Sequence, residues 1–196
     1  MKTGFFGDSY DIVKRTLLEW LQPLGNWAVH PMFTEEVRDE FAVDFSSLIG
    51  APLISVEALR PGTDRESYFR PCGVHQHVFL DPNTGLKIRR DRSERSPDHL
   101  FDSDLLPIID VRPGGLTMVF DQSLSRGRTV KEQLEEKLAH FRAQGFSGFA
   151  YTSHACFLFL AREPATAEHA HHLLCGERRL PKERFLQQCV SAEGSL

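Results

Sequence analysis

Apolar residues recur along the chain in two patterns, one typical of amphipathic helices and the other of short buried strands. Residues 129–144 form the clearest predicted helix, because Val130, Leu134 and Leu138 fall on one stripe. Helical spacing predicts further helices over residues 8–22, 34–48, 102–110 and 166–175, the last followed by residues 178–190 around Pro181. Apolar runs predict strands over residues 26–30, 51–59, 74–80, 116–120, 148–152 and 156–161.

The order of these elements predicts the fold class. Helices that alternate with short apolar strands are typical of a mostly parallel sheet covered by helices on both faces. The last two predicted strands are joined by a short turn at residues 153–155, so we expect an antiparallel hairpin that closes the sheet. The predicted fold is a three-layer, Rossmann-like α/β structure. It forms one domain over residues 1–196, with charged loops near 60–73 and 87–98.

Composition narrows the class of protein without indicating a function. The chain has 196 residues, of which 41% are hydrophobic and 26% charged, as is typical of a soluble globular protein. Its formal charge of −4 gives no overall positive field to attract nucleic acid or an anionic membrane. The four cysteines form no CxxC pair, and no stretch approaches the roughly 20 apolar residues of a membrane-spanning helix. We therefore expect a reduced, cytoplasmic protein without a membrane partner.

Polar residues follow four of the predicted strands at the point where each strand ends. If these strands are parallel, the residues lie at one edge of the sheet, where open α/β sheets bind ligands. The candidate catalytic residues are His30, Asp81, Asp121 and His154. The candidate substrate-binding residues are Asn83, Thr84, Gln122, Ser123, Arg126 and, if the first helix begins at this edge, Asp8. The alternative is structural, because aspartates commonly turn the chain after a strand and a histidine there is often a hydrogen-bonded core residue.

Other candidate sites rest on fewer residues. His75 with His77, and His169 with His172, are close enough in sequence to share a metal ion, although each pair lacks a third ligand nearby. Basic residues between Lys87 and Arg95 form one local segment that could attract a polyanion, so nucleic acid stays open as a partner. The chain lacks the P-loop, GxSxG and HExxH motifs, which disfavours P-loop, serine-hydrolase and zinc-protease chemistry.

Four segments occur in an order that carries a family resemblance. They are VFLDPNTG (78–85), RPGGLTMVF (112–120), LAHFRAQGF (138–146) and CFLFLARE (156–163). In this order they resemble the Rossmann-like methyltransferases, and the opening of the chain with GAPL (50–53) also resembles the three-Cys-motif partner proteins, a methyltransferase-like group. The resemblance implies an S-adenosylmethionine cofactor and an amine held by Asp81 and Pro82.

The sequence departs from this family at two places. Asn83 and Thr84 stand where the amine-holding loop of the family has a proline and an aromatic residue that stacks on the base. The segment HPMFTEE (30–36) has no glycine, although the family places a glycine-rich turn there to approach the methyl donor. A chain with this segment is expected to bind S-adenosylmethionine differently or not at all.

Three functions remain open. The first is a methyltransferase-like enzyme, active or degenerate, in which Asp81 and Asn83 orient an amine or hydroxyl and the His30 loop lies near the donor. The second is a phosphoesterase or nuclease in which Asp81 and Asp121, with Asp8, bind Mg²⁺ or Mn²⁺, while His30 or His154 transfers protons and Arg126 holds phosphate. The third is a non-catalytic binding module. The expected partner is a small-molecule or nucleotide-type substrate.

Overall fold

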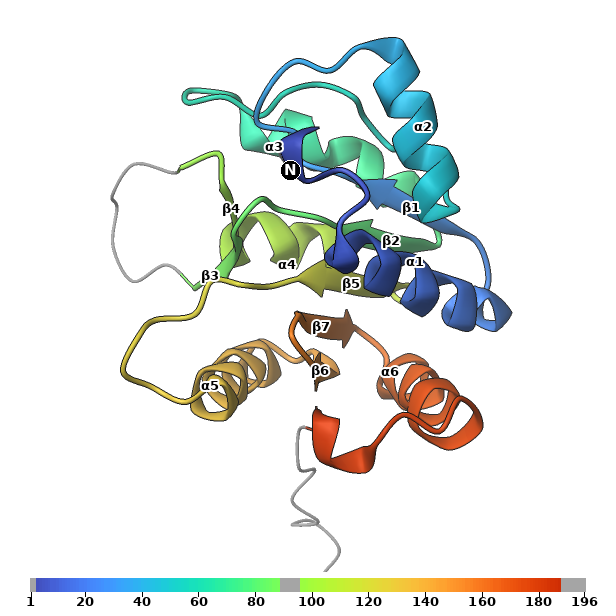
Figure 1. Cartoon of the computed structure of the whole chain (residues 1–196). Helices are drawn as coiled ribbons and strands as arrows, with labels where there is room; N and C mark the ends of the chain where they lie inside the picture. Colours follow the sequence, from blue (N-terminus) through green and yellow to red (C-terminus); the bar gives the residue numbers. More distant parts are fainter. Residues whose placement is uncertain (1–2, 89–95, 188–196) are drawn as a thin grey trace, which may run out of the picture.

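The computed structural model describes residues 3–88 and 96–187 of the chain (Figure 1). The helices are α1 (Ser9–Leu21), α2 (Asp39–Ile49), α3 (Arg65–Phe69), α4 (Asp102–Asp110), α5 (Val130–Ala143) and α6 (Pro164–His171). The strands are β1 (Trp27–His30), β2 (His77–Leu80), β3 (Gly85–Lys87), β4 (His99–Phe101), β5 (Leu116–Phe120), β6 (Ser147–Thr152), β7 (Cys156–Ala161) and β8 (Phe185–Gln187). Short 3₁₀ turns cover Thr3–Phe5, Gln22–Leu24, Arg70–Val74 and Lys182–Arg184, and a π-helical turn covers His172–Glu177.

Six strands form one mixed sheet in the order β1-β2-β5-β7-β6-β8. Strands β1, β2 and β5 are parallel, whereas β7 runs antiparallel to both of its neighbours, β5 and β6. Strand β6 therefore points in the same direction as β1, β2 and β5, and β8 is antiparallel to β6. The predicted α/β class, the mostly parallel sheet and the closing hairpin are confirmed. Strands β3 and β4 form a separate two-stranded sheet.

The core lies on both faces of the main sheet, because successive side chains of a strand point to opposite faces. Phe79 and Met118 pack on one face with helices α1, α2 and α6. Val78 and Val119 pack on the other face with helices α3, α4 and α5. In Figure 1 the two groups of helices flank the sheet. Within the described residues, no helix is long and apolar enough to cross a membrane.

Local sequence signals explain where the two best-predicted helices begin. The Asp8 carboxylate accepts hydrogen bonds from the backbone N–H groups of Tyr10 and Asp11, so Asp8 caps α1. Thr129 and Glu132 form a reciprocal capping box at the start of α5. The Asp8 cap sets where α1 begins, and the ion pair of Lys14 with Asp81 holds this helix beside the end of β2.

Several predicted elements differ from the observed ones. Helix α2 begins at Asp39 and not at residue 34, because the chain bends at residues 34–35 and Arg38, directly before the helix, has an extended and not a helical backbone conformation. Residues 51–59 form no strand and make only one isolated bridge, between Leu53 and Val29. The segment 60–73, predicted as a charged loop, contains helix α3. Its Arg65 is buried and forms a bidentate ion pair with the Asp104 carboxylate. Strand β8 lies within residues 178–190, where no strand was predicted.

Candidate functional site

The edge of the sheet at which four strands end brings together several of the predicted residues. Since β1, β2, β5 and β6 point in the same direction, His30, Asp81, Asp121 and Ser153 all lie at this edge. Helix α1 begins at the same edge and places Lys14 against Asp81. The strands that these residues follow therefore point in the same direction, as the prediction required. The contacts of the individual residues nevertheless differ from one strand end to the next.

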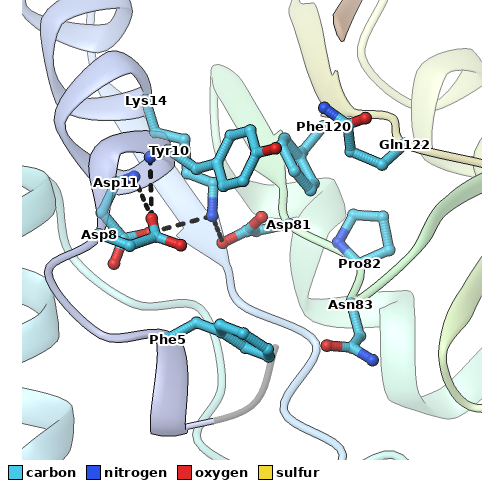
Figure 2. A pocket seen from close by; sticks show the side chains of 10 residues that line it. All are labelled: Phe5, Asp8, Tyr10, Asp11, Lys14, Asp81, Pro82, Asn83, Phe120 and Gln122. Atoms are coloured by element: carbon cyan, nitrogen blue, oxygen red, sulfur yellow. Dashed lines mark hydrogen bonds and ion pairs between the residues drawn. The ribbon is translucent and has the colours of Figure 1, made fainter. Parts of the chain in front are cut away.

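One pocket of about 160 Å³ opens at this edge (Figure 2). We call it the strand-end pocket, and its lining residues are Phe5, Asp8, Tyr10, Asp11, Lys14, Asp81, Pro82, Asn83, Phe120 and Gln122. They come from the N-terminal segment, from helix α1 and from the residues at the ends of β2 and β5. The pocket is therefore built by joining the start of the chain to the sheet edge.

Two buried carboxylates share one lysine at the base of the strand-end pocket. Lys14 Nζ donates to Asp81 Oδ2 at 2.8 Å and to Asp11 Oδ1 at 3.0 Å. The second Asp11 oxygen accepts a hydrogen bond from Gly7 N–H at 2.9 Å, which ties the N-terminal segment to the same cluster. Asp81 itself is only 1% exposed. We call Asp11, Lys14 and Asp81 the acid–lysine cluster.

Burial and charge act in opposite directions on this cluster. Burial alone lowers the pKa of Lys14, but the carboxylates of Asp81 and Asp11 outweigh it and hold that pKa above its ordinary value. Burial raises the pKa of Asp81, and the Lys14 ammonium offsets the rise only in part. Lys14 is therefore a fixed cation and not a free amine nucleophile.

Aromatic rings form the wall above the acid–lysine cluster. The Lys14 ammonium lies 4.7 Å from the centre of the Phe120 ring, and Tyr10 packs edge-on against Phe120 at 5.6 Å. The other face of the Tyr10 ring stacks on the exposed imidazole of His154 at 5.1 Å. Phe5 completes the lining from the N-terminal segment although 60% of its side chain is exposed.

Three of the predicted substrate-binding residues line the strand-end pocket. Asp8 does so while capping α1, and Asn83 and Gln122 do so while donating to other groups. Asn83 Nδ2 donates to Asp98 Oδ1 at 2.8 Å, and Gln122 Nε2 donates to the His154 carbonyl at 3.1 Å. Thr84, Ser123 and Arg126 are not among the lining residues. Thr84 instead accepts a hydrogen bond from Gln122 N–H through its carbonyl.

Asp121 lies outside the strand-end pocket in a closed cluster of its own. Lys137 Nζ donates to Asp121 Oδ2 at 2.5 Å, and also to the carbonyls of Leu86 and Ser123. The other oxygen, Oδ1, accepts from Leu86 N–H and Ser123 N–H, each at 3.0 Å. Asp121, Leu86 and Lys137 are buried and Ser123 is half-buried, so these hydrogen bonds hold strand β3 against the end of β5.

The two candidate catalytic histidines also lie apart from the base of the pocket. His30 is fully buried beside the rings of Tyr68 and Phe69, and burial lowers its pKa to about 4. Its Nε2 has no hydrogen-bond partner among the residues described. His154 is exposed, and it contacts lining residues of the pocket through its ring, which stacks on Tyr10, and through its backbone carbonyl, which accepts from Gln122.

The other sequence candidates for a metal or polyanion site are not assembled into a site. The part of the chain that the structure describes contains no group of three or more His, Cys, Asp or Glu side chains placed to hold a metal ion. Both ring nitrogens of His77 bond to backbone, with Leu116 N–H donating to Nδ1 and Nε2 lying 3.1 Å from the Leu24 carbonyl. Most of the basic segment, residues 89–95, lies outside the described residues.

A second and larger pocket lies between helices α3 and α4. It has a volume of about 580 Å³ and is lined by Arg65, Glu66, Phe69, Arg70, Gly73, Ser103, Asp104, Pro107, Ile108 and Val111. Its most buried polar groups, Arg65 and Asp104, are already paired. We call it the helix pocket.

Asp81 was predicted as a site residue, but the other residues at the base and wall of the strand-end pocket, Asp11, Lys14, Tyr10 and Phe120, were not. Lys14 carries a signal that could have revealed it, because it precedes the buried Leu17 and Leu18 by three and four residues and so lies on the apolar stripe of α1. A lysine on such a stripe requires a buried partner. Tyr10 and Phe120 have no comparable signal, since aromatic residues on a helix or strand are ordinarily core residues.

Comparison with protein-family models, with curated proteins and with solved structures gives no match for this chain. The resemblance to methyltransferases thus stays a prediction, and the function is argued from the geometry of the strand-end pocket.

Proposed function

We propose that the protein binds a small molecule in the strand-end pocket and holds it by accepting hydrogen bonds from its amine or hydroxyl groups. The supporting observation is that three acceptor oxygens of the lining side chains accept no hydrogen bond from the described residues. The side-chain amides of Asn83 and Gln122 donate within the protein, while their carbonyl oxygens accept nothing from the described residues. Asp81 Oδ1 accepts nothing from them either. A ligand that brings donors satisfies these acceptors.

The scaffold around this pocket is, we infer, Rossmann-like and similar to that of the methyltransferases. Strand β2 with Asp81-Pro82 is followed by α4, a Pro-Gly-Gly turn, β5, α5 ending before Gly145, and the β6–β7 hairpin. This is the order on which the resemblance rests. Both Asp81 and Pro82 line the pocket, which fits the amine-holding role that the resemblance implies for them.

The segment after β1 does not fit S-adenosylmethionine in the way the resemblance implies. Residues 30–33 are all buried, and Met32 adopts a left-handed backbone conformation with φ +47° while burying its side chain completely. Large side chains therefore fill the place where a glycine-rich turn would let backbone approach a methyl donor. We derive no methyl-transfer step for this chain and favour ligand binding on a methyltransferase-like scaffold.

The alternative of a Mg²⁺ or Mn²⁺ phosphoesterase is less well supported. Asp81 and Asp121 would be its metal ligands, yet each carboxylate is paired with its own buried lysine, Lys14 or Lys137. A divalent cation would have to displace a protein ammonium from each of them. Arg126, the expected phosphate ligand, is exposed and does not line the pocket.

Backbone amide chemical shifts in NMR titrations test the proposed site with two ligands that differ in one donor. Benzyl alcohol carries a hydroxyl donor, and benzyl methyl ether has the same ring without one. We expect the alcohol to shift the amide signals of Tyr10, Asn83 and Gln122 and the ether to shift them much less. S-adenosylhomocysteine should leave the signals of residues 30–33 in place.

Two results would contradict the proposal. In the first, neither compound perturbs the strand-end pocket at millimolar concentration. In the second, the perturbed amides belong to the helix pocket, for example Phe69, Ser103 and Val111, and not to α1 or the strand ends. Saturable shifts of the amide signals of residues 30–33 with S-adenosylhomocysteine would instead support the hypothesis of a methyltransferase.

A further inference from the structure

The strand-end pocket contains more negative than positive formal charge. Three of its lining residues are acidic, namely Asp8, Asp11 and Asp81, and Lys14 is the one basic lining residue among those described. Asp11 and Asp81 share the single ammonium. Grouped carboxylates with too few cations around them attract a positively charged ligand, and the attraction is strengthened where water is largely excluded.

One oxygen of Asp81 has no hydrogen-bond donor among the described residues. Oδ2 is bound by Lys14, whereas Oδ1 accepts no hydrogen bond from any described residue, although the Asp81 side chain is only 1% exposed. Figure 2 shows this second oxygen on the side of the carboxylate away from Lys14. Burial raises the pKa of Asp81, and the Lys14 ammonium offsets that rise only in part. A charged N–H donor would supply both the missing hydrogen bond and the missing charge.

The walls of the pocket suit a flat cation. Phe120 already interacts through its ring face with the Lys14 ammonium at 4.7 Å, and the Phe5 and Tyr10 rings line the same space. Aromatic ring faces attract cations. The volume of about 160 Å³ is close to that of an engineered cavity of roughly 150 Å³ that takes up one benzene molecule. One six-membered ring with a small charged group therefore matches the available space.

We propose that the strand-end pocket selects a small planar organic cation with N–H donors, such as an amidinium on a single ring, over neutral and anionic molecules of the same shape. This inference rests on the proposed function, because it assigns a charge to the ligand that the pocket is proposed to bind. One amidinium N–H would donate to Asp81 Oδ1, and the carbonyl oxygens of Asn83 and Gln122 offer further acceptors.

Three nearly isosteric probes separate charge from shape: benzamidine is a cation, benzamide is neutral and benzoate is an anion at pH 7. Their dissociation constants are measured by chemical-shift titration, followed at the amides of Tyr10, Asn83 and Gln122. We expect benzamidine to bind at least about tenfold more tightly than benzamide, as for a hydrogen bond to a charged group, and benzoate to bind most weakly.

Two kinds of variant locate the effect. Asp81→Asn keeps the shape of the side chain and should reduce the preference for benzamidine over benzamide to near unity. Asp44→Asn makes the same change on the exposed side of α2, outside the pocket, and should leave the preference unchanged. Gln122 is half-buried at the rim, so Gln122→Lys should weaken benzamidine binding and Gln122→Glu should strengthen it, even if Asp81→Asn fails to fold.

The possible results are distinguishable. If benzamide or benzoate binds in the pocket as tightly as benzamidine, the cation preference is wrong while the small-molecule site stands. If none of the probes perturbs the pocket, both the site and its charge preference are wrong. A preference for benzamidine that is the same in Asp81→Asn and unaffected by the Gln122 variants would also overturn the inference, because the cation would then bind elsewhere.

Discussion

Two buried lysine–aspartate pairs lie at neighbouring strand ends of this protein, and they differ in how completely they are satisfied. At the end of β5, both oxygens of Asp121 accept hydrogen bonds, and Lys137 also donates to two backbone carbonyls. At the end of β2, Asp81 shares Lys14 with Asp11, and its Oδ1 accepts no hydrogen bond from the part of the chain that the structure describes. A lysine and an aspartate therefore form a fully hydrogen-bonded structural pair at one strand end and line a pocket at the next.

Of the two carboxylates, only Asp81 has an oxygen that accepts no hydrogen bond from the described residues, so only Asp81 keeps an acceptor for the proposed ligand. Around Asp121 even the space is used up, because Gly85 lies so close that a Cβ atom there would be 2.3 Å from Asp121 Oδ1. Backbone from strand β3 thus fills the region in which a ligand would bind. Next to Asp81, the corresponding region is the strand-end pocket.

Removing Lys137, the lysine paired with Asp121, should have the largest effect on stability. Lys137→Met leaves the Asp121 carboxylate buried without its cation, and we expect a loss of about 3–5 kcal/mol in the free energy of unfolding. Lys131→Met is the matched control on the same helix, since its exposed pair with Glu135 is expected to contribute less than about 1 kcal/mol. Urea unfolding measures both. Equal losses in the two variants would show that the Asp121 cluster is not a fastening.

A third strand end, that of β1, carries the buried His30 in place of a lysine–aspartate pair. Burial lowers the pKa of His30 to about 4 from its ordinary value of 6.5. The unfolded chain therefore binds a proton that folded His30 resists, so stability should fall as the pH drops from about 6.5 to about 4, and the loss should then level off. The shift corresponds to about 3 kcal/mol.

The His30 contribution is measured by urea unfolding across this pH range. His30→Phe keeps an aromatic ring in the cage of Tyr68 and Phe69 but cannot titrate, so its stability should depend less steeply on pH. His169→Gln changes an exposed histidine and serves as the control. A His30→Phe variant with the same pH slope as the parent would argue against this assignment.

Neutralising Asp81, the carboxylate that shares Lys14 with Asp11, should reduce the free energy of unfolding only slightly. Asp81→Asn removes a carboxylate whose pKa burial holds above its ordinary value, and Lys14 keeps Asp11 as a partner. We expect a change within about 1 kcal/mol at pH 7, in contrast to the loss from Lys137→Met. Because the folded pKa is raised, the parent should gain stability relative to the variant as the pH falls through that pKa. A loss as large as that of Lys137→Met would place Asp81 in the same structural class as Asp121.

Divalent cations should have the smallest effect. Since a lysine ammonium already binds Asp81 and another binds Asp121, Mg²⁺ and Mn²⁺ should not raise the melting temperature measurably. Thermal unfolding with millimolar metal salt, compared with the same ionic strength of NaCl, tests this. A specific rise that Asp81→Asn and Asp121→Asn both abolish would instead support the phosphoesterase alternative.

Much of the fold could be predicted because its strongest signals are local. Apolar residues at helical spacing located α1 and α5, and continuous apolar runs located β5 and β7. Helix α3 escaped prediction because the burial of its Arg65 depends on Asp104, which lies far along the chain. Strand β8 escaped for a similar reason, since a three-residue strand is defined by its partner β6 and not by its own pattern.

The sequence by itself determined that polar residues follow several strands at one edge of the sheet, because strand direction and apolar patterning are encoded locally. Only the tertiary structure decided which of these residues are open to a ligand. Asp81 and Asp121 both follow buried apolar strands, and nothing in their neighbouring residues shows that Lys14 is shared while Lys137 is not. Whether a buried carboxylate has a free oxygen depends on every donor within about 3 Å, and those donors come from distant parts of the chain.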